Sequence, residues 1–455
     1  MKKVLMIVYH YPPLAGMGML RSLKFAKYLP YYGWKPIILT VAASSISPIH
    51  SQYWLCDEAE GNLPHVRIIR TPFVSFNSLY RPLCSSSIPT NKTLTSTQLI
   101  KRSTSNKLIK TFLKYIWNEW VLFPDSVIGW YPFAVKKAID YIRAQNINLI
   151  FSTSLPVTSH IIANAICKKT GLPWVTDFRD AWSQPHYKTT SRLRAKLDKV
   201  IEIRTLRKAN ALVTVSEPLR LKLLNIHKQF SDRSFVIYNG FDPDDYGHPL
   251  QNKENYFNIT FTGRMYDIDF NGTGRNPRLL FNALNQLFQE GKLDPNKVRC
   301  DIYGEYPYQL EEMILNYNLQ NLVRCFGPVP FRKSFTLQQN STILLLLTWS
   351  DLNYKGVVTG KIFEYLGARK NILAIPFYND DVARILHDTK AGVLITDLSE
   401  LKSQLYEWYQ EYNKKGAVNY RGIESELEKY SRKQATKALS EIFNTFSHTS
   451  SAISQ

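Results

Sequence analysis

The chain has 455 residues, of which 44% are hydrophobic, and its 57 Lys and Arg against 37 Asp and Glu leave a formal net charge of +20. This composition is globular, and the length predicts two or three domains with their own cores. The five cysteines are odd in number and widely spaced, which excludes a disulfide scaffold and a paired-cysteine metal or redox motif. No apolar run reaches the roughly 18 residues of a membrane span.

The first half of the chain alternates predicted strands and helices. The apolar residues 4–9 precede His-Tyr-Pro-Pro instead of a signal-peptide cleavage site, so we expect the first strand of a cytoplasmic protein. A glycine loop, a helix from residue 20 and a strand at 34–41 complete a βαβ unit. Further strands are predicted at 149–152, 174–176 and 211–215, and helices at 159–169, 192–210 and 218–225. The pattern indicates a parallel sheet covered by helices.

Residues 75–130 interrupt this alternation. A Ser/Thr/Asn-rich stretch at 85–106 predicts a mobile loop, and apolar residues then recur at helical spacing between Leu108 and Val121, with lysines on the other side. An amphipathic helix of this kind suits an anionic membrane surface. Ordinary packing on the N-terminal sheet, with solvated lysines, is the alternative.

The alternation restarts after a turn signal at 239–245 and a polar stretch at 247–256. Strands are predicted at 257–262, 298–303, 322–326, 343–347 and 372–375, and helices at 277–289, 309–316, 331–338 and 361–368. We therefore expect two doubly wound α/β domains, at 1–247 and 256–423, followed by a C-terminal helix and flexible tail at 424–455.

The positive charge is concentrated in the first half. Residues 1–250 contain 33 basic and 15 acidic side chains, whereas residues 251–455 contain 24 and 22. Such a field attracts polyanions: nucleic acid, an anionic membrane face or a phosphorylated substrate. A basic surface that only maintains solubility is the remaining alternative.

Two loop-to-helix segments are candidate anion sites. Gly16 and Gly18 open the first helix, where free N–H groups favour an anion, although a tight turn also explains them. The absence of a third glycine and of an acid after the second strand makes a nicotinamide cofactor a poor fit. In the second half, residues 355–366 bring the amides of Thr359 and Gly360 and the side chain of Lys361 to a helix start that suits a pyrophosphate.

Carboxylates beside these segments are candidate functional groups. Glu364 is one turn into the second helix and can accept hydrogen bonds from ribose hydroxyls, but from the residues alone it is equally a capping or surface carboxylate. Asp177 and Asp180 follow a strand, where either can position an acceptor hydroxyl or act as a base; alternatively Arg179 pairs with one of them. His160 begins the preceding helix and either faces a cleft or is structural.

The acidic cluster of Asp242, Asp244 and Asp245 imitates an Asp-x-Asp metal motif. It lies in the predicted interdomain turn, where Asp favours turn geometry. We therefore expect no metal and no cofactor.

Four motifs in the same order resemble those of GT-B glycosyltransferases of the family 4 type, especially those of bacterial capsule and exopolysaccharide clusters. The resemblance spans nearly the whole chain, and its most specific part is the segment 355–375. The motifs are the Gly16, Gly18 and Arg21 loop, residues 236–242, residues 261–264 and residues 359–366.

The resemblance implies the GT-B fold, in which two Rossmann-like domains face a central cleft, with the donor in the C-terminal domain and the acceptor mainly in the N-terminal one. Glu364 would then hold the donor ribose. Arg264 and Lys361, with the amides of Thr359 and Gly360, would stabilise the leaving diphosphate. Gly16 and Gly18 would approach the donor, and Arg21 and His160 would lie on the acceptor side.

Two positions depart from the family pattern. Gly356 replaces a glutamate that commonly contacts the donor sugar, so the identity of that sugar is open. The usual lysine partner of Arg264 is not evident, and Arg275 is a candidate substitute.

The expected function is a cytoplasmic glycosyltransferase, peripheral at the inner membrane face. It would move a hexose-type sugar from a nucleoside diphosphate to a lipid-linked saccharide in cell-surface polysaccharide synthesis, with retention implied by the resemblance. Alternatives are a sugar-nucleotide epimerase of the same fold and a noncatalytic basic protein that binds membrane or nucleic acid. We expect no nucleic-acid partner, because no zinc finger, RRM or helix-turn-helix signature is present.

Overall fold

The computed structural model describes residues 1–14, 17–42, 61–75, 117–184, 191–247, 256–265, 275–349, 358–376 and 378–447. The chain forms two compact units. Unit 1 comprises Met1–Thr214, Lys222–Phe235 and Ser440–Gln455, and unit 2 comprises Val215–Leu221 and Val236–Leu439. Unit 2 thus starts ahead of the predicted boundary at 247–256. The end of the chain returns to unit 1, where Phe443 packs against Trp34 and Phe151.

Unit 1 is built on a seven-stranded sheet in the order β3-β2-β1-β4-β5-β6-β7. Its strands are β1 (Lys2–Ile7), β2 (Trp34–Val41), β3 (Arg67–Thr71), β4 (Leu149–Ser154), β5 (Trp174–Phe178), β6 (Ala211–Thr214) and β7 (Ser234–Val236). The pairs from β3 to β6 are parallel. The central strands are buried on both faces, as their continuous apolar sequences require.

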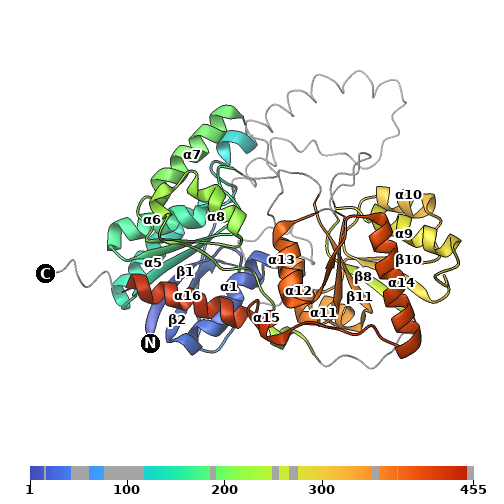
Figure 1. Ribbon diagram of the computed structural model, residues 1–455. Coiled ribbons are helices and arrows are strands. Elements are labelled where there is room, and N and C mark those ends of the chain that lie inside the picture. The colour runs from blue at the N-terminus through green and yellow to red at the C-terminus, as the bar shows by residue number, and fades with distance from the viewer. Residues whose placement is uncertain are drawn as a thin grey trace, which may run out of the picture. The chain divides into compact units, whose positions relative to one another are not determined.

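Helices cover both faces of this sheet (Figure 1). They are α1 (Met17–Tyr28), α5 (Tyr131–Ala144), α6 (Thr158–Thr170), α7 (Arg192–Leu206), part of α8 (Glu217–Leu224) and the end of α16 (Arg432–Ser447). The strand order reverses between β1 and β4. Such a reversal is the topological switch point, where doubly wound sheets bind ligands beyond the carboxyl ends of their strands.

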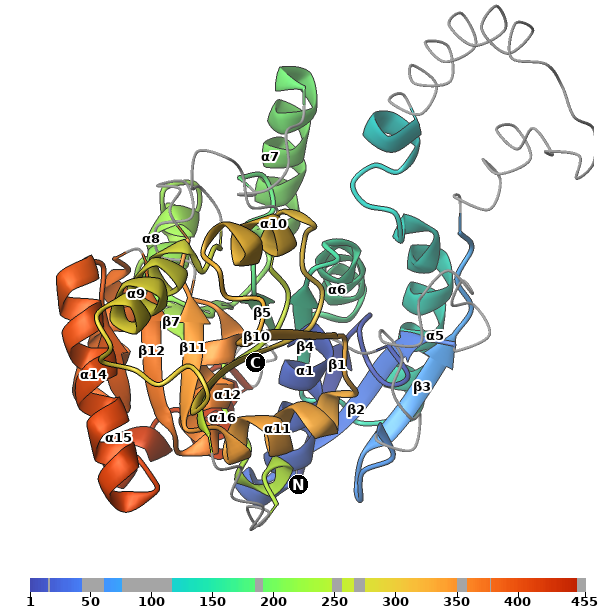
Figure 2. The same ribbon diagram turned by 90° about the vertical axis from the view of Figure 1, so that its right-hand side faces the viewer.

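Unit 2 repeats this plan with six strands in the order β10-β9-β8-β11-β12-β13, all in parallel pairs. Figure 2 shows β11 and β12 of this sheet next to each other. The strands are β8 (Phe257–Thr262), β9 (Val298–Tyr303), β10 (Val323–Gly327), β11 (Ile343–Leu347), β12 (Asn371–Ile375) and β13 (Gly392–Leu394). The helices are α9 (Arg278–Gln289), α10 (Gln309–Asn316), α11 (Phe331–Asn340), α12 (Gly360–Ala368), α13 (Asp380–Thr389), α14 (Leu398–Lys415) and α15 (Glu424–Glu428). Its switch point lies between β8 and β11.

Each face of the unit 2 sheet has its own apolar core. One core joins β8, β9 and β11 to α9, α10 and α14. The other joins β11 and β12 to α12, α13 and α15. Because both faces are covered, the inner strands read as apolar runs in sequence, which is why β8, β9 and β11 were predicted with their observed bounds.

The helix predicted at the C-terminus is divided in the structure into two helices, α15 and α16. Phe241 pairs with Ser431 between them: its N–H donates to the carbonyl of Tyr430, and its carbonyl accepts from Arg432. These backbone groups are therefore taken out of a continuous helix.

The predicted insertion at 75–130 is described only in part. The loop at 85–106 and most of the amphipathic stripe lie outside the described residues, and Trp117–Val121 forms one π-helical turn. Among the helices that the structure describes, none combines the length and apolarity that crossing a bilayer requires.

Candidate active site

Glu364 lies on α12 near the switch point of unit 2 and is only 5% exposed. Its Oε2 accepts hydrogen bonds from Nζ of Lys361, at 2.6 Å, and from Nε2 of Gln338, at 3.2 Å. Its Oε1 is buried and has no hydrogen-bond partner among the described residues. A buried carboxylate oxygen without a donor is costly, so this atom is poised to accept a hydrogen bond from a ligand.

Two tyrosines hold this part of α12 in place. The hydroxyl of Tyr246 donates to the Glu364 carbonyl at 2.5 Å, and its burial raises its pKa well above the usual value, so it remains a donor. The ring of Tyr246 lies against Gly367, where an added Cβ would come within 2.5 Å of it. Tyr365 accepts from the Thr262 N–H at 3.0 Å and so joins α12 to the end of β8.

The N-terminus of α12 lies one turn before Glu364 on the same helix. Thr359 is the N-cap, and its side chain accepts from the Lys361 N–H at 3.4 Å, while Gly360 is the first helical residue. Lys361 is partly exposed, with 24% of its side chain accessible, and the stem of its side chain passes 3.4 Å from the position of a Cβ on Gly263. The helix dipole and this cation favour an anion here.

Arg264 follows β8 and is half-exposed, and its Nε lies 3.0 Å from Glu305 Oε2. Gly304, at φ +130°, lets the backbone after β9 approach the backbone after β8. A Cβ on Gly304 would lie 1.7 Å from the Gly263 carbonyl oxygen. Arg275, the candidate substitute for the missing lysine, lies over the Trp349 ring at 4.9 Å. These cations lie on the loops around the carboxyl ends of the unit 2 strands.

The predicted acceptor-side residues of unit 1 gather at its own switch point. Arg21 of α1 and Asp177 of β5 are both fully buried and form a bidentate pair, with Nη2 to Oδ1 at 2.8 Å. Thr153 of β4 donates to Asp177 Oδ2 at 2.8 Å. The alternative in which Arg179 pairs with Asp177 is replaced by this Arg21 pair. An acceptor hydroxyl would have to break it to reach either side chain, so the observed contacts are those of a scaffold.

His160 is fully buried on α6 rather than turned to solvent. Its Nδ1 lies 2.7 Å from the Ser152 hydroxyl, and its ring lies 4.5 Å from that of Phe178. Burial lowers its pKa to about 3, against a smaller opposing effect of Asp177, so the ring is neutral near pH 7. These surroundings are those of a core histidine.

Arg179 is positioned against the glycine loop of unit 1. Its Nε and Nη2 donate to the carbonyls of Ser154 and Leu155, each at 2.5 Å. An added Cβ on Gly18 would lie 1.5 Å from Arg179 Nη1, so glycine is required there by this close approach. Asp180 is half-buried beyond β5, and Gly16 lies outside the described residues.

The aspartates at the start of unit 2 adopt the expected turn geometry. Asp242 caps a short 3₁₀ helix, and its side chain accepts from the Asp244 N–H at 3.1 Å. In the part of the chain that the structure describes, no three His, Cys, Asp or Glu side chains gather in a group able to hold a metal ion.

Sequence reasoning missed Gln338, Glu305 and Tyr246, each of which contacts a predicted site residue. They lie on other elements and belong to no local motif. Gly356, where the family pattern has a glutamate, lies outside the described residues.

Residues 114–245 match the family described as Glycosyltransferase Family 4. No curated protein matches the chain significantly. Solved structures that share its fold include the following three, each of which matches over almost its entire length. HepE of Anabaena, in complex with UDP and glucose, is 14% identical with a TM-score of 0.60, covering 98% of this chain and 100% of its own.

A glycosyltransferase of Rickettsia africae is 16% identical with a TM-score of 0.59 and 98% coverage of both chains. Sucrose-phosphate synthase of Thermosynechococcus elongatus is 13% identical with a TM-score of 0.59, covering 98% of this chain and 99% of its own. The shared fold and the family match confirm the expected resemblance: the chain is a glycosyltransferase of GT-B fold, similar to family 4.

Proposed function

We propose that this glycosyltransferase takes a sugar from a nucleoside-diphosphate donor bound to unit 2 and transfers it, with retention, to a lipid-linked saccharide in cell-surface polysaccharide synthesis. The observation that carries the donor assignment is the buried Oε1 of Glu364, which has no partner among the described residues. HepE structures are described with UDP and with UDP-glucose, which supports a nucleotide-sugar donor.

The surroundings of Glu364 fit the two ends of such a donor. A ribose hydroxyl would donate to Oε1 and relieve the cost of its burial. The diphosphate would lie near the amides of Thr359 and Gly360, the ammonium of Lys361 and the guanidinium of Arg264. These fixed donors and cations would stabilise the negative charge that develops on the leaving phosphate oxygen when the glycosidic bond breaks.

The proposal of a lipid-linked acceptor rests on the positive charge of the first half of the chain. Residues 1–250 hold 33 of the basic and only 15 of the acidic side chains, a surplus that attracts an anionic membrane and a diphosphate-linked lipid. The protein would accordingly act peripherally at the cytoplasmic face of the membrane.

The donor assignment is tested by calorimetric titration of sugar nucleotides and free nucleoside diphosphates into the wild type and Glu364→Gln. The wild type should bind one nucleotide series. Glu364→Gln should weaken its affinity about tenfold or more, and equally for the free diphosphate and the sugar nucleotide, since both contain the ribose.

Glu424→Gln is the matched control, because Glu424 is an exposed carboxylate of unit 2 that pairs with Arg369. It should bind like the wild type. Unchanged affinity in Glu364→Gln, or a loss seen only with the sugar attached, would remove the ribose assignment.

A further inference from the structure

Helix α7 of unit 1 is firmly anchored along its inner face. The guanidinium of Arg194 is 1% exposed, donates to the carbonyls of Glu119 and Pro124 and to Asp198, and lies 4.3 Å from the Phe123 ring centroid. The Glu119 carboxylate in turn accepts from the Ser191 N–H at 2.9 Å, next to the helix start. These contacts fix which face of α7 is turned outward.

Both acidic residues of α7 belong to this inner face. Asp198 pairs with Arg194 at 2.8 Å and accepts from the indole N–H of Trp182 at 3.3 Å. Glu202 is fully buried, with Oε1 3.1 Å from His227 Nε2. The outward face of α7 therefore carries no carboxylate.

A stripe of large aliphatic side chains runs along the outward face. Their spacings of four, three and three residues place them on one side of the helix. They are Leu193, 58% exposed, Leu197, 37%, Val200, 42%, and Ile203, 40%. Single exposed apolar residues are ordinary, but four in one stripe of an anchored helix mark an interaction surface.

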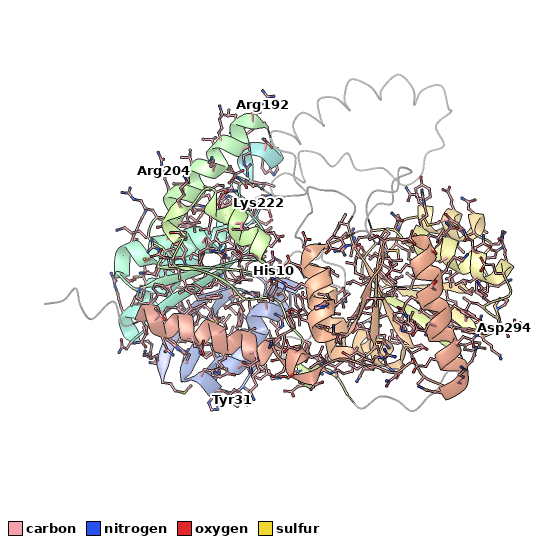
Figure 3. The ribbon with its side chains drawn as sticks, viewed as in Figure 1. His10, Tyr31, Arg192, Arg204, Lys222 and Asp294 are labelled. Carbon is pink, nitrogen blue, oxygen red and sulfur yellow. The ribbon has the colours of Figure 1, made fainter. Side chains whose placement is uncertain are left out.

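Cations interleave with this stripe. Arg192 and Arg204 extend from α7 away from the sheet (Figure 3). The exposed cations of the helix and the two residues after it are Arg192, Lys196, Lys199, Arg204, Arg207 and Lys208. Within the described residues, no ion pair involves their side chains. The outward face thus combines exposed aliphatic side chains with charged side chains that are all positive.

We propose that the outward face of α7 docks on the surface of an anionic lipid bilayer. Aliphatic side chains enter the boundary between headgroups and acyl chains, while the interleaved Lys and Arg contact lipid phosphates. Trp120 and Val121, each 39% exposed, adjoin the Glu119 carbonyl that binds Arg194, and extend this surface with an aromatic anchor.

The charge pattern selects this occupant over others. A second copy of the face would oppose like charges, and nucleic acid would gain nothing from the aliphatic stripe. The inference rests on the proposed function at a membrane. It adds α7 to the stripe between Leu108 and Val121, for which the sequence pattern suggested the same kind of docking.

The test is cosedimentation of the full chain with two kinds of vesicle, at low and at high salt. One kind is phosphatidylcholine alone, and the other also contains about 30 mol% phosphatidylglycerol, an anionic lipid. Wild type should bind only the anionic vesicles and be partly released by salt. Leu197→Ser with Val200→Ser, and separately Lys196→Gln with Lys199→Gln, should each lower the partition coefficient about tenfold or more.

Matched controls lie on unit 2. Leu315→Ser removes an exposed leucine of α10, and Lys415→Gln with Lys429→Gln removes two exposed lysines. These variants should partition like the wild type. Equal partitioning of the α7 variants and the wild type would overturn the proposal, as would wild-type binding to DNA but not to vesicles, or self-association that the α7 variants abolish.

Titration of the same α7 variants with the nucleotide that wild type binds separates this proposal from the proposed function. Unchanged nucleotide affinity with lost vesicle binding supports both. Vesicle binding through α7 without any nucleotide binding would leave the docking surface standing and refute the donor assignment.

Discussion

Lys361 and Glu364 lie one helical turn apart on α12, and the lysine ammonium contacts only one of the two carboxylate oxygens, Oε2, at 2.6 Å. Gln338 donates to the same oxygen, so both protein donors are on Oε2, and Oε1 has no hydrogen-bond donor among the described residues. The pair thus neutralises a buried charge while keeping one acceptor available. Lys361, expected from the sequence as a phosphate ligand, is therefore also the counter-ion of the ribose candidate.

Lys361→Met should destabilise the protein by about 1–3 kcal/mol, because it leaves the Glu364 carboxylate buried without its cation. The free energy of unfolding of unit 2 measured by urea titration checks this. Adding Glu364→Gln should restore part of the loss, since a neutral amide needs no counter-ion. Strictly additive losses in the double variant would show that the two side chains are not coupled.

Arg264→Ala should lower kcat about 10²-fold with a smaller change in KM for the donor, if the guanidinium stabilises the leaving diphosphate. Steady-state kinetics with the nucleotide sugar that binds best gives both constants. Glu305→Gln removes only the carboxylate partner of Arg264 and should reduce kcat much less. Wild-type turnover by Arg264→Ala would contradict the assigned role.

Gly18→Ala should lower the stability of unit 1 by about 1–2 kcal/mol, because the new methyl group displaces the Arg179 guanidinium from its two carbonyl acceptors. In an Arg179→Ala background the same change should instead stabilise by about 0.5–1 kcal/mol, since alanine is the better helix former. Thermal or urea unfolding of the four proteins measures this reversal of sign. Destabilisation of equal size in both backgrounds would mean that Arg179 does not impose the glycine.

His160 should make unit 1 less stable as the pH falls from about 6.5 towards 3. Its folded pKa of about 3 lies below the usual 6.5, so between these values the unfolded chain binds the extra proton. The stabilisation is present above pH 6.5 and is lost by about 1.4 kcal/mol per pH unit below it.

His160→Gln should flatten that slope when urea unfolding is followed between pH 6.5 and 4.5. His387, which is 77% exposed, provides the control His387→Gln, whose profile should follow the wild type. A wild-type slope in His160→Gln would assign the acid sensitivity to other groups.

Local sequence patterns were sufficient for much of the fold. The predicted bounds of β2, β8, β9, α10 and β11 coincide with the observed ones. These strands are apolar runs buried on both faces, and helical periodicity distinguishes the elements between them. Strands β3 and β13 and the helices α5, α13 and α14 were not predicted. Two arginines interrupt the five residues of β3, and β13 has only three residues, so neither strand is a recognisable apolar run.

The candidate site likewise has a part that was predictable from the sequence and a part that was not. Residues 359–364 are neighbours along the chain, so the sequence alone identified their glycine, lysine and glutamate as the start of a helix after a loop. The contacts of Glu364 with Gln338, 26 residues away, and of Arg21 with Asp177, 156 residues away, arise only when the strands are set in their order. Sequence spacing carries no signal for such pairs.

By itself, the sequence determined the alternation of strands and helices, the cationic first half and the motifs of a GT-B glycosyltransferase, because each depends on composition or on neighbours along the chain. The tertiary structure alone decided that Arg21 and Asp177 neutralise each other in a buried pair, that Phe241 divides the last helix, and that α7 turns its acids inward and its cations and aliphatic stripe outward. Each of these depends on which side chains face each other across elements, and packing rather than local propensity sets that relation.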